Sequence, residues 1–291
     1  MFIILLNLLI NLSRASTIFP ETWVDLALEA SELAVRTAGN TLEVKELKNH
    51  LLVKRYRDSY SSFQAFQFEC LELCDFHKVF AISGTQSHQG NFDWKDWAAN
   101  LSFGLQQFDS EAAHTFKNDL REAMSEGPVL LTGHSIGGLL AQTMLYEFYL
   151  EETTEIPVAL ITFASPGSYQ IIERIHLRDY PQIDFNPGDV LALPSVNFAF
   201  KKDVVPRLGQ QVGEVWYLPS MYTKGLPNDH WTHYIPGIGS LIKAHLYPAF
   251  KKGFKDGALY KLIPMSKRPI IPGPKLRRLG EKISNWWLRR F

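Results

Sequence analysis

The sequence is poor in cysteine, with Cys70 and Cys74 as its only two, and this scarcity excludes a scaffold built on disulfides. No further ligands follow these cysteines at the spacing of a zinc site. We therefore expect two half-buried thiols beside a hairpin, since a local disulfide would require an oxidising compartment. No metal and no cofactor are expected.

Long hydrophobic runs are also lacking. The apolar run from Phe2 to Ile10 is shorter than the ~20 residues that a membrane-spanning helix needs. It fits the apolar region of a signal peptide, and Ser13 to Ala15 offers a small-x-small cleavage site, although a basic segment before it is missing. We expect residues 1–15 to be a signal peptide, which favours secretion. The alternative is an uncleaved apolar segment on a cytoplasmic or peripheral membrane protein.

An excess of charge is lacking as well, because the formal net charge is zero, and nucleic acid is therefore not an expected partner. The zero hides an asymmetry: residues 251–291 hold 12 basic and two acidic residues, a net charge of +10. Prolines from Ile263 onward predict a linker, and residues 275–291 follow as a basic amphipathic helix. The extension 263–291 suits contact with an anionic membrane surface, or alternatively docking onto the acidic body.

What is present is an alternation of strand and helix patterns. Apolar runs at 61–69, 77–85, 128–132, 156–166 and 213–219 predict strands, and amphipathic or apolar patterns at 20–39, 109–127 and 135–152 predict helices. The strands are continuously apolar rather than alternating, which is typical of a buried parallel sheet. We predict an α/β fold over residues 16–262, with a mostly parallel central sheet and helices on both faces.

The stretch "GPVLLTGHSIGG" contains Gly-x-Ser-x-Gly between a predicted strand and a predicted helix. The motif alone arises by chance about once in ten chains of this length. In this context it predicts a strained turn that exposes the Ser135 hydroxyl, with the Ile136 N–H available to stabilise an oxyanion. Ser135 is therefore a candidate nucleophile.

A nucleophilic serine needs a histidine base and an acid that orients it, and in α/β-hydrolases both follow the serine. Asp203 in "KKDVVPRLG" and Asp189 in "NPGDVLALP" are both candidates, because each precedes a valine and a later proline. Several histidines also lie downstream. The spacing alone does not choose among them.

Over roughly residues 60–250 the chain resembles the class 3 lipases, an α/β-hydrolase family. The similar segments are "ISGT", "FDWKDWAANLSF", "LLTGHSIGGLLA", "ITFASPG", "KKDVVPRLG" and "KAHLYPAF". "ISGT" departs from the family pattern, because Ser83 stands where an arginine is usual, and this puts a structural ion pair in doubt. The segment from Phe92 onward lies where fungal relatives have a lid. It can alternatively be a helix packed on the core.

The resemblance implies a catalytic triad of Ser135, Asp203 and His245, with Asp189 and His233 as runners-up. It implies an oxyanion hole made by the backbone N–H groups of Thr85 and Ile136. By this resemblance the protein is a serine hydrolase that cleaves carboxylic esters of lipids, either acylglycerols or phospholipids, without a metal. The alternatives are an esterase or thioesterase for soluble substrates and a non-enzymatic membrane or partner-binding protein.

Overall fold

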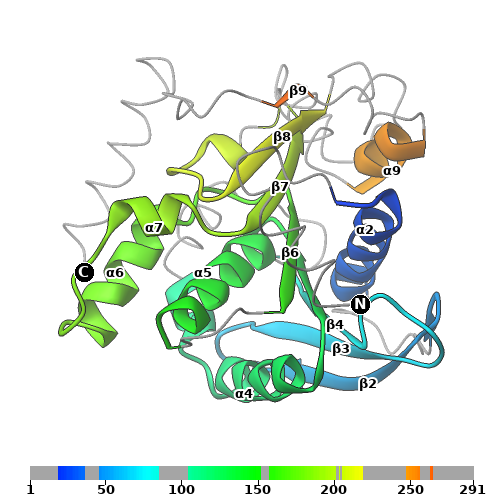
Figure 1. Cartoon of the computed structure of the whole chain (residues 1–291), viewed down its shortest axis with the longest axis horizontal. Coiled ribbons are helices and arrows are strands. Elements are labelled where there is room, and N and C mark those ends of the chain that lie inside the picture. Colours follow the sequence, from blue (N-terminus) through cyan, green and yellow to red (C-terminus); the bar gives the residue numbers. More distant parts are fainter. Residues whose placement is uncertain are drawn as a thin grey trace, which may run out of the picture.

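The computed structural model describes residues 19–36, 46–84, 104–151, 157–200, 203, 205–218, 247–255 and 263–264. Within these residues a nine-stranded sheet runs through the molecule, and its spatial order β1 to β9 is the order of the strands in the chain. The five strands from β4 to β8 are parallel to one another, while antiparallel strands extend both sides (Figure 1). The sheet therefore has a parallel centre, as predicted.

The strands are short and their pairing is regular except for an irregularity between Leu52 and Lys54. Their bounds are β1 Glu46–Leu47, β2 His50–Arg57, β3 Gln64–Cys70, β4 Lys78–Ile82, β5 Val129–His134, β6 Val158–Phe163, β7 Ser195–Phe200, β8 Glu214–Leu218 and β9 Ile263–Pro264. All six residues of β5 and of β7 are buried, because helices cover both faces of the sheet there.

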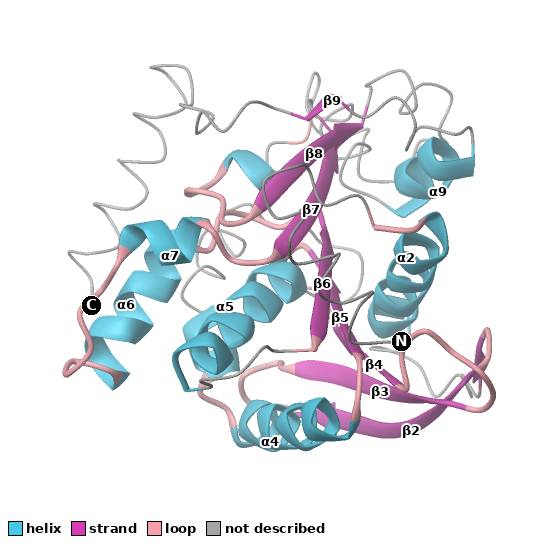
Figure 2. Ribbon diagram, viewed as in Figure 1, coloured by secondary structure: helices cyan, strands magenta, loops and turns pink. Residues whose placement is uncertain are grey.

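Helices lie on both faces (Figure 2). Helices α2 (Glu21–Arg36) and α9 (Tyr247–Lys255) cover one face, and α4 (Glu111–Glu126), α5 (Ile136–Glu151), α6 (Tyr169–Asp179) and α7 (Pro187–Leu191) lie on the other. Each face has its own hydrophobic core. This two-faced covering of a mostly parallel sheet is the α/β arrangement that the sequence predicts.

Local sequence explains how two of these helices begin and what they bury. The Ser110 hydroxyl accepts a hydrogen bond from the Ala113 N–H at 3.2 Å and so caps α4. Helix α5 is apolar almost all round and is buried from Ile136 to Phe148, as expected for a helix packed between the sheet and other helices. Helix α5 therefore holds its first turn, next to Ser135, in a rigid environment.

The predicted helices and strands around the Gly-x-Ser-x-Gly motif are confirmed, and several features differ from expectation, among them the following three. Strand β2 was not predicted, because its sequence "HLLVKRYR" carries exposed basic residues that obscure an apolar period. Ile263–Pro264, the start of the predicted linker, pairs with β8 as a short edge strand, where a proline is tolerated. Cys70 and Cys74 form a disulfide rather than two free thiols, because the β3–β4 turn brings them together.

Other expectations lie outside the described residues: the signal peptide at 1–15, the lid segment that includes Phe92, and the basic helix at 275–291. In the described part of the chain, no helix combines the length and the apolar character needed to cross a bilayer.

Candidate active site

Ser135 lies in a sharp turn between the end of β5 and the start of α5. Its φ angle of 56° is in the left-handed region, which costs free energy for a residue with a side chain. The turn is held because the Ser135 N–H donates to the Phe163 carbonyl at 2.9 Å, while the Ser135 carbonyl accepts from Gly138 at 3.0 Å. A strained serine fixed between a strand and a helix is the geometry of a nucleophile elbow.

Two glycines of the motif allow the turn to close. A Cβ atom added to Gly133 would lie 2.4 Å from the Gly137 carbonyl carbon, and one added to Gly137 would lie 2.3 Å from the Ile82 carbonyl oxygen. Neither approach leaves room for a methyl group. The pattern Gly-x-Ser-x-Gly is therefore required here because α5 begins in direct contact with β4 and β5.

The end of β4 reaches the same place. A Cβ atom added to Gly84 would lie 3.4 Å from the Ser135 Cβ, so the backbone just after β4 borders the serine. The residue after Gly84 is Thr85, which lies outside the described residues. Ile136 is the first residue of α5, so its N–H belongs to the group of helix N-terminal donors that intrahelical bonds leave available.

Asp203 lies after the end of β7 and is completely buried. Its N–H donates to the Phe200 carbonyl at 2.9 Å, and its Oδ1 accepts from the Val205 N–H at 2.9 Å. Strands β5 and β7 are parallel and flank β6, so Ser135 and Asp203 follow the same edge of the sheet. Two strand spacings separate their strands by about 9.6 Å, a gap that one imidazole with its hydrogen bonds can bridge.

Asp189 lies at the amino ends of the parallel strands, opposite to the end that carries Ser135. It belongs to α7, which precedes β7, and its side chain is exposed. Its charge acts on the buried hydroxyl of Tyr146, and burial followed by this charge raises the pKa of Tyr146 to about 12. Tyr146 is ten residues into α5, or about 15 Å from Ile136. The structure therefore brings Asp203, and not Asp189, to the edge where Ser135 lies.

A buried amide network, which sequence reasoning missed, ties the turns at this edge together. Asn197 on β7 accepts from the Ser165 N–H at 3.1 Å and donates to the Gln211 Oε1 at 3.0 Å. Gln211 in turn donates to the Pro206 carbonyl at 2.7 Å, in the turn after Asp203. The only sequence signal for it was an asparagine within the otherwise apolar strand "SVNFAF".

Helix α9 packs at the same edge, and one of its buried aromatic rings lies next to both turns. The Phe250 ring centroid lies 6.4 Å from that of His134, 5.6 Å from Phe163 and 4.9 Å from Phe200. His134 precedes Ser135, the Phe163 carbonyl holds the Ser135 N–H, and the Phe200 carbonyl holds the Asp203 N–H. Phe250 thus contacts the residues that support both turns. His245 and His233 lie outside the described residues.

Tyr217 on β8 adds a polar group close to Asp203. Its hydroxyl is buried and makes no hydrogen bond within the described chain. Burial raises the pKa of Tyr217 to about 12; Arg207 acts to lower it and Asp203 to raise it further. The phenol therefore stays protonated and neutral beside the carboxylate.

Comparison with known proteins bears on this site directly. The family model described as lipase (class 3) matches residues 54–212, which is more than half of the chain and includes Ser135 and Asp203. The chain is a class 3 lipase. As a class 3 lipase it is a carboxylic ester hydrolase, and its substrate is a lipid.

Solved structures similar to this class 3 lipase include fungal lipases. The propeptide complex of Rhizomucor miehei lipase is 14% identical with a TM-score of 0.45, covering 68% of this chain and 67% of that one. A lipase from Rhizopus microsporus var. chinensis is 16% identical with a TM-score of 0.46, covering 70% and 75%. A lipase from Yarrowia lipolytica is 14% identical with a TM-score of 0.46, covering 68% and 77%. No curated protein matches the chain.

Proposed function

We propose that Ser135, His245 and Asp203 form a catalytic triad that hydrolyses the ester bonds of acylglycerols or phospholipids through an acyl-enzyme. The observation that carries this proposal is the position of Ser135 and Asp203 after two parallel strands, at the same edge of the sheet. A nucleophile and an acid at one edge need only a base between them.

The position of α9 supports His245 as this base. His245 is two residues before Tyr247, the first residue of α9, so its Cα lies within about 7.6 Å of the Tyr247 Cα along the chain. Phe250 packs this helix against the supports of both Ser135 and Asp203. The runner-up His233 is 14 positions before the start of α9.

The reaction follows from these roles. The Ser135 Oγ attacks the ester carbonyl as its proton moves to His245, and the charged oxygen formed is stabilised by the N–H groups of Ile136 and Thr85, each worth about 3 kcal/mol. Asp203 orients the imidazole and stabilises its charged form. The alcohol then leaves with the proton, and a water activated by His245 releases the fatty acid.

An active-site probe tests the triad. A fluorophosphonate should label the wild-type chain at Ser135 and should not label Ser135→Ala. His245→Ala should abolish labelling, while His233→Ala, as the matched control, should retain it. Labelling that survives in His245→Ala and disappears in His233→Ala would move the base to His233.

The substrate class is tested separately, with a panel of triacylglycerol emulsions, phospholipid vesicles and soluble esters and thioesters, and mass spectrometry of the products. Activity that rises above the aggregation threshold of the substrate supports a lipid surface as the site of action. Equal activity on monomeric soluble esters supports the esterase alternative, and the triad would be unaffected by that result.

A further inference from the structure

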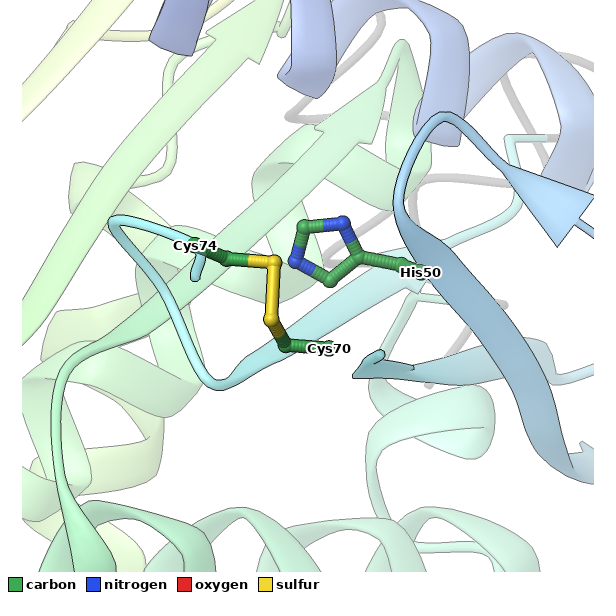
Figure 3. A group of neighbouring side chains, drawn as sticks. All are labelled: His50, Cys70 and Cys74. Carbon is green, nitrogen blue, oxygen red and sulfur yellow. A yellow bond between two sulfur atoms is a disulfide. The ribbon is translucent and has the colours of Figure 1, made fainter. Parts of the chain in front are cut away.

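A second cluster of reactive side chains lies away from Ser135, where strands β2 and β3 are paired. His50 and Cys70 are opposite each other in the β2–β3 register, and Cys74 follows in the turn that leads to β4. One potential ligand atom from each of the three residues lies within 4.8 Å of the other two. In Figure 3 one edge of the His50 ring faces the sulfur of Cys74.

His50 is only partly satisfied in the disulfide form. The residue is 3% exposed, its Nε2 lies 3.1 Å from the Phe76 carbonyl oxygen, and its buried Nδ1 makes no hydrogen bond within the described chain. A neutral ring carries one N–H, so it can donate to the Phe76 carbonyl or to the Leu47 carbonyl, but not to both at once.

We propose that reduction of the Cys70–Cys74 disulfide creates a zinc site, in which the two thiolates and the Nε2 of His50 are ligands. A dithiol supplies the two electrons: its own sulfurs join as a disulfide, the Cys70–Cys74 bond breaks, and its two protons pass to the cysteines. Zinc then replaces these two protons, which are released to solvent. Two sulfurs and one imidazole nitrogen, with a fourth position open to water, form a donor set that zinc prefers.

Zinc binding would also resolve the unpaired nitrogen. When Nε2 gives its lone pair to the metal, the ring proton moves to Nδ1. The Leu47 carbonyl, which is already close enough to act on the ring, can then accept from Nδ1–H. Ligand histidines commonly donate their second N–H to a backbone carbonyl in this way.

The site is distinct from the proposed catalytic one. The turn from Cys70 to Lys78 enters β4 at the amino end of the parallel strands, whereas Ser135 follows β5 at the carboxyl end. Zinc here would close the β3–β4 turn in reduced protein, as the disulfide does in oxidised protein. It would take no part in ester hydrolysis.

The test is a zinc titration of the full chain, before and after reduction with dithiothreitol and its removal without oxygen. Reduced wild-type protein should bind one more equivalent of zinc than the oxidised protein and than Cys70→Ser/Cys74→Ser. His50→Gln should weaken this binding at least about tenfold. His77→Gln, a histidine in the same turn, should leave it unchanged.

X-ray absorption at the zinc edge gives a readout that needs no variant. The bound zinc should show two sulfur neighbours at about 2.3 Å and an imidazole nitrogen at about 2.0–2.1 Å. The proposal is overturned if reduction adds no zinc beyond the level of the serine variant. It is equally overturned if the zinc has sulfur but no imidazole neighbour, or if folded His50→Gln binds as tightly as wild type.

Discussion

At the carboxyl ends of β5 and β6 the chain turns through buried left-handed backbone, whereas the left-handed residues Lys48 and Leu73, in turns at the amino end of the sheet, are exposed. At the carboxyl edge Ser135 and Ala164 have φ angles of 56° and 50°, and the turns are tied together by main-chain and amide hydrogen bonds. At the amino edge a disulfide closes the β3–β4 turn, and Asp189 lies on an exposed helical turn before β7.

This difference shows where the fold holds the backbone in an unfavourable conformation. Strained backbone persists only where its surroundings over-determine it, and such surroundings are typical of functional sites. Changes at the carboxyl edge should therefore alter chemistry as well as stability, and changes at the amino edge should alter stability alone.

The largest expected effect comes from the two aspartates on either side of β7. Asp203→Asn keeps an oxygen for the Val205 N–H but removes the charge that orients the base, so kcat on a soluble ester should fall about 10⁴-fold. Asp189→Asn should change kcat less than about twofold. Reversed magnitudes would make Asp189 the acid and would break the comparison of the two edges.

The next effect separates two phenylalanines of α9. Phe250→Ala and Phe254→Ala each remove a buried ring and should lower the free energy of unfolding by about 3–5 kcal/mol. Only Phe250 contacts His134 and Phe200, whereas Phe254 contacts Phe163 and Phe198. Fluorophosphonate labelling per folded molecule should therefore slow in Phe250→Ala only, and Phe250→Leu should partly restore it. Equal slowing in Phe254→Ala would reduce Phe250 to a packing role.

A glycine at each edge gives a third contrast. Gly137→Ala would place a methyl group 2.3 Å from the Ile82 carbonyl oxygen and should cost about 3 kcal/mol in urea unfolding. Gly188→Ala at the amino edge meets only the Asn186 side chain at 3.2 Å and should change stability by less than about 1 kcal/mol. A tolerated Gly137→Ala would contradict the tight contact between α5 and β4.

The disulfide should contribute less than these contacts. It closes a turn of five residues, so Cys70→Ser/Cys74→Ser should lower the free energy of unfolding by about 2 kcal/mol, as measured with urea. Reduction of the wild-type chain in the presence of a zinc chelator should give the same loss. A much larger loss would mean that the turn organises more of the sheet than its contacts indicate.

The smallest effect concerns the ion pair of Lys78 and Glu126, also at the amino edge. The hydrogen bond and the charge of Lys78 lower the pKa of Glu126, but the Glu126 side chain is 47% exposed, so solvent screens the pair. A carboxylate with a lowered pKa stabilises the fold above its unfolded pKa of about 4.3 and loses this contribution as the pH falls further. Glu126→Gln should cost less than about 1 kcal/mol at pH 7, with the difference from wild type vanishing in acid and kcat unchanged.

Much of the fold could be predicted from local sequence, because the strands and helices around Ser135 are long, apolar and bounded by glycines or caps. Strand β2 could not, since only His50 and Tyr56 of its eight residues are buried and its pairing shifts register between Leu52 and Lys54. No helix was predicted between Tyr169 and Val196, where the chain forms α6, α7 and the start of β7.

The sequence predicts the type of candidate site, but it does not identify every residue of it. Asp189 and Asp203 have similar local sequences, and they differ only in whether they precede or follow β7, which is a property of the folded chain. His50 is 20 positions before Cys70, and only the β2–β3 register makes them neighbours. Neither relation can be derived from the spacing of residues along the chain.

The identity of spatial and chain order in the sheet has a consequence for synthesis. Each strand from β2 to β9 pairs with the strand made just before it, so a chain emerging from the ribosome always has a finished edge on which to add the next strand. Asp203, α9 and β9 come late in this sequence. A nascent chain can therefore complete most of its sheet before it acquires the groups that we propose make Ser135 reactive.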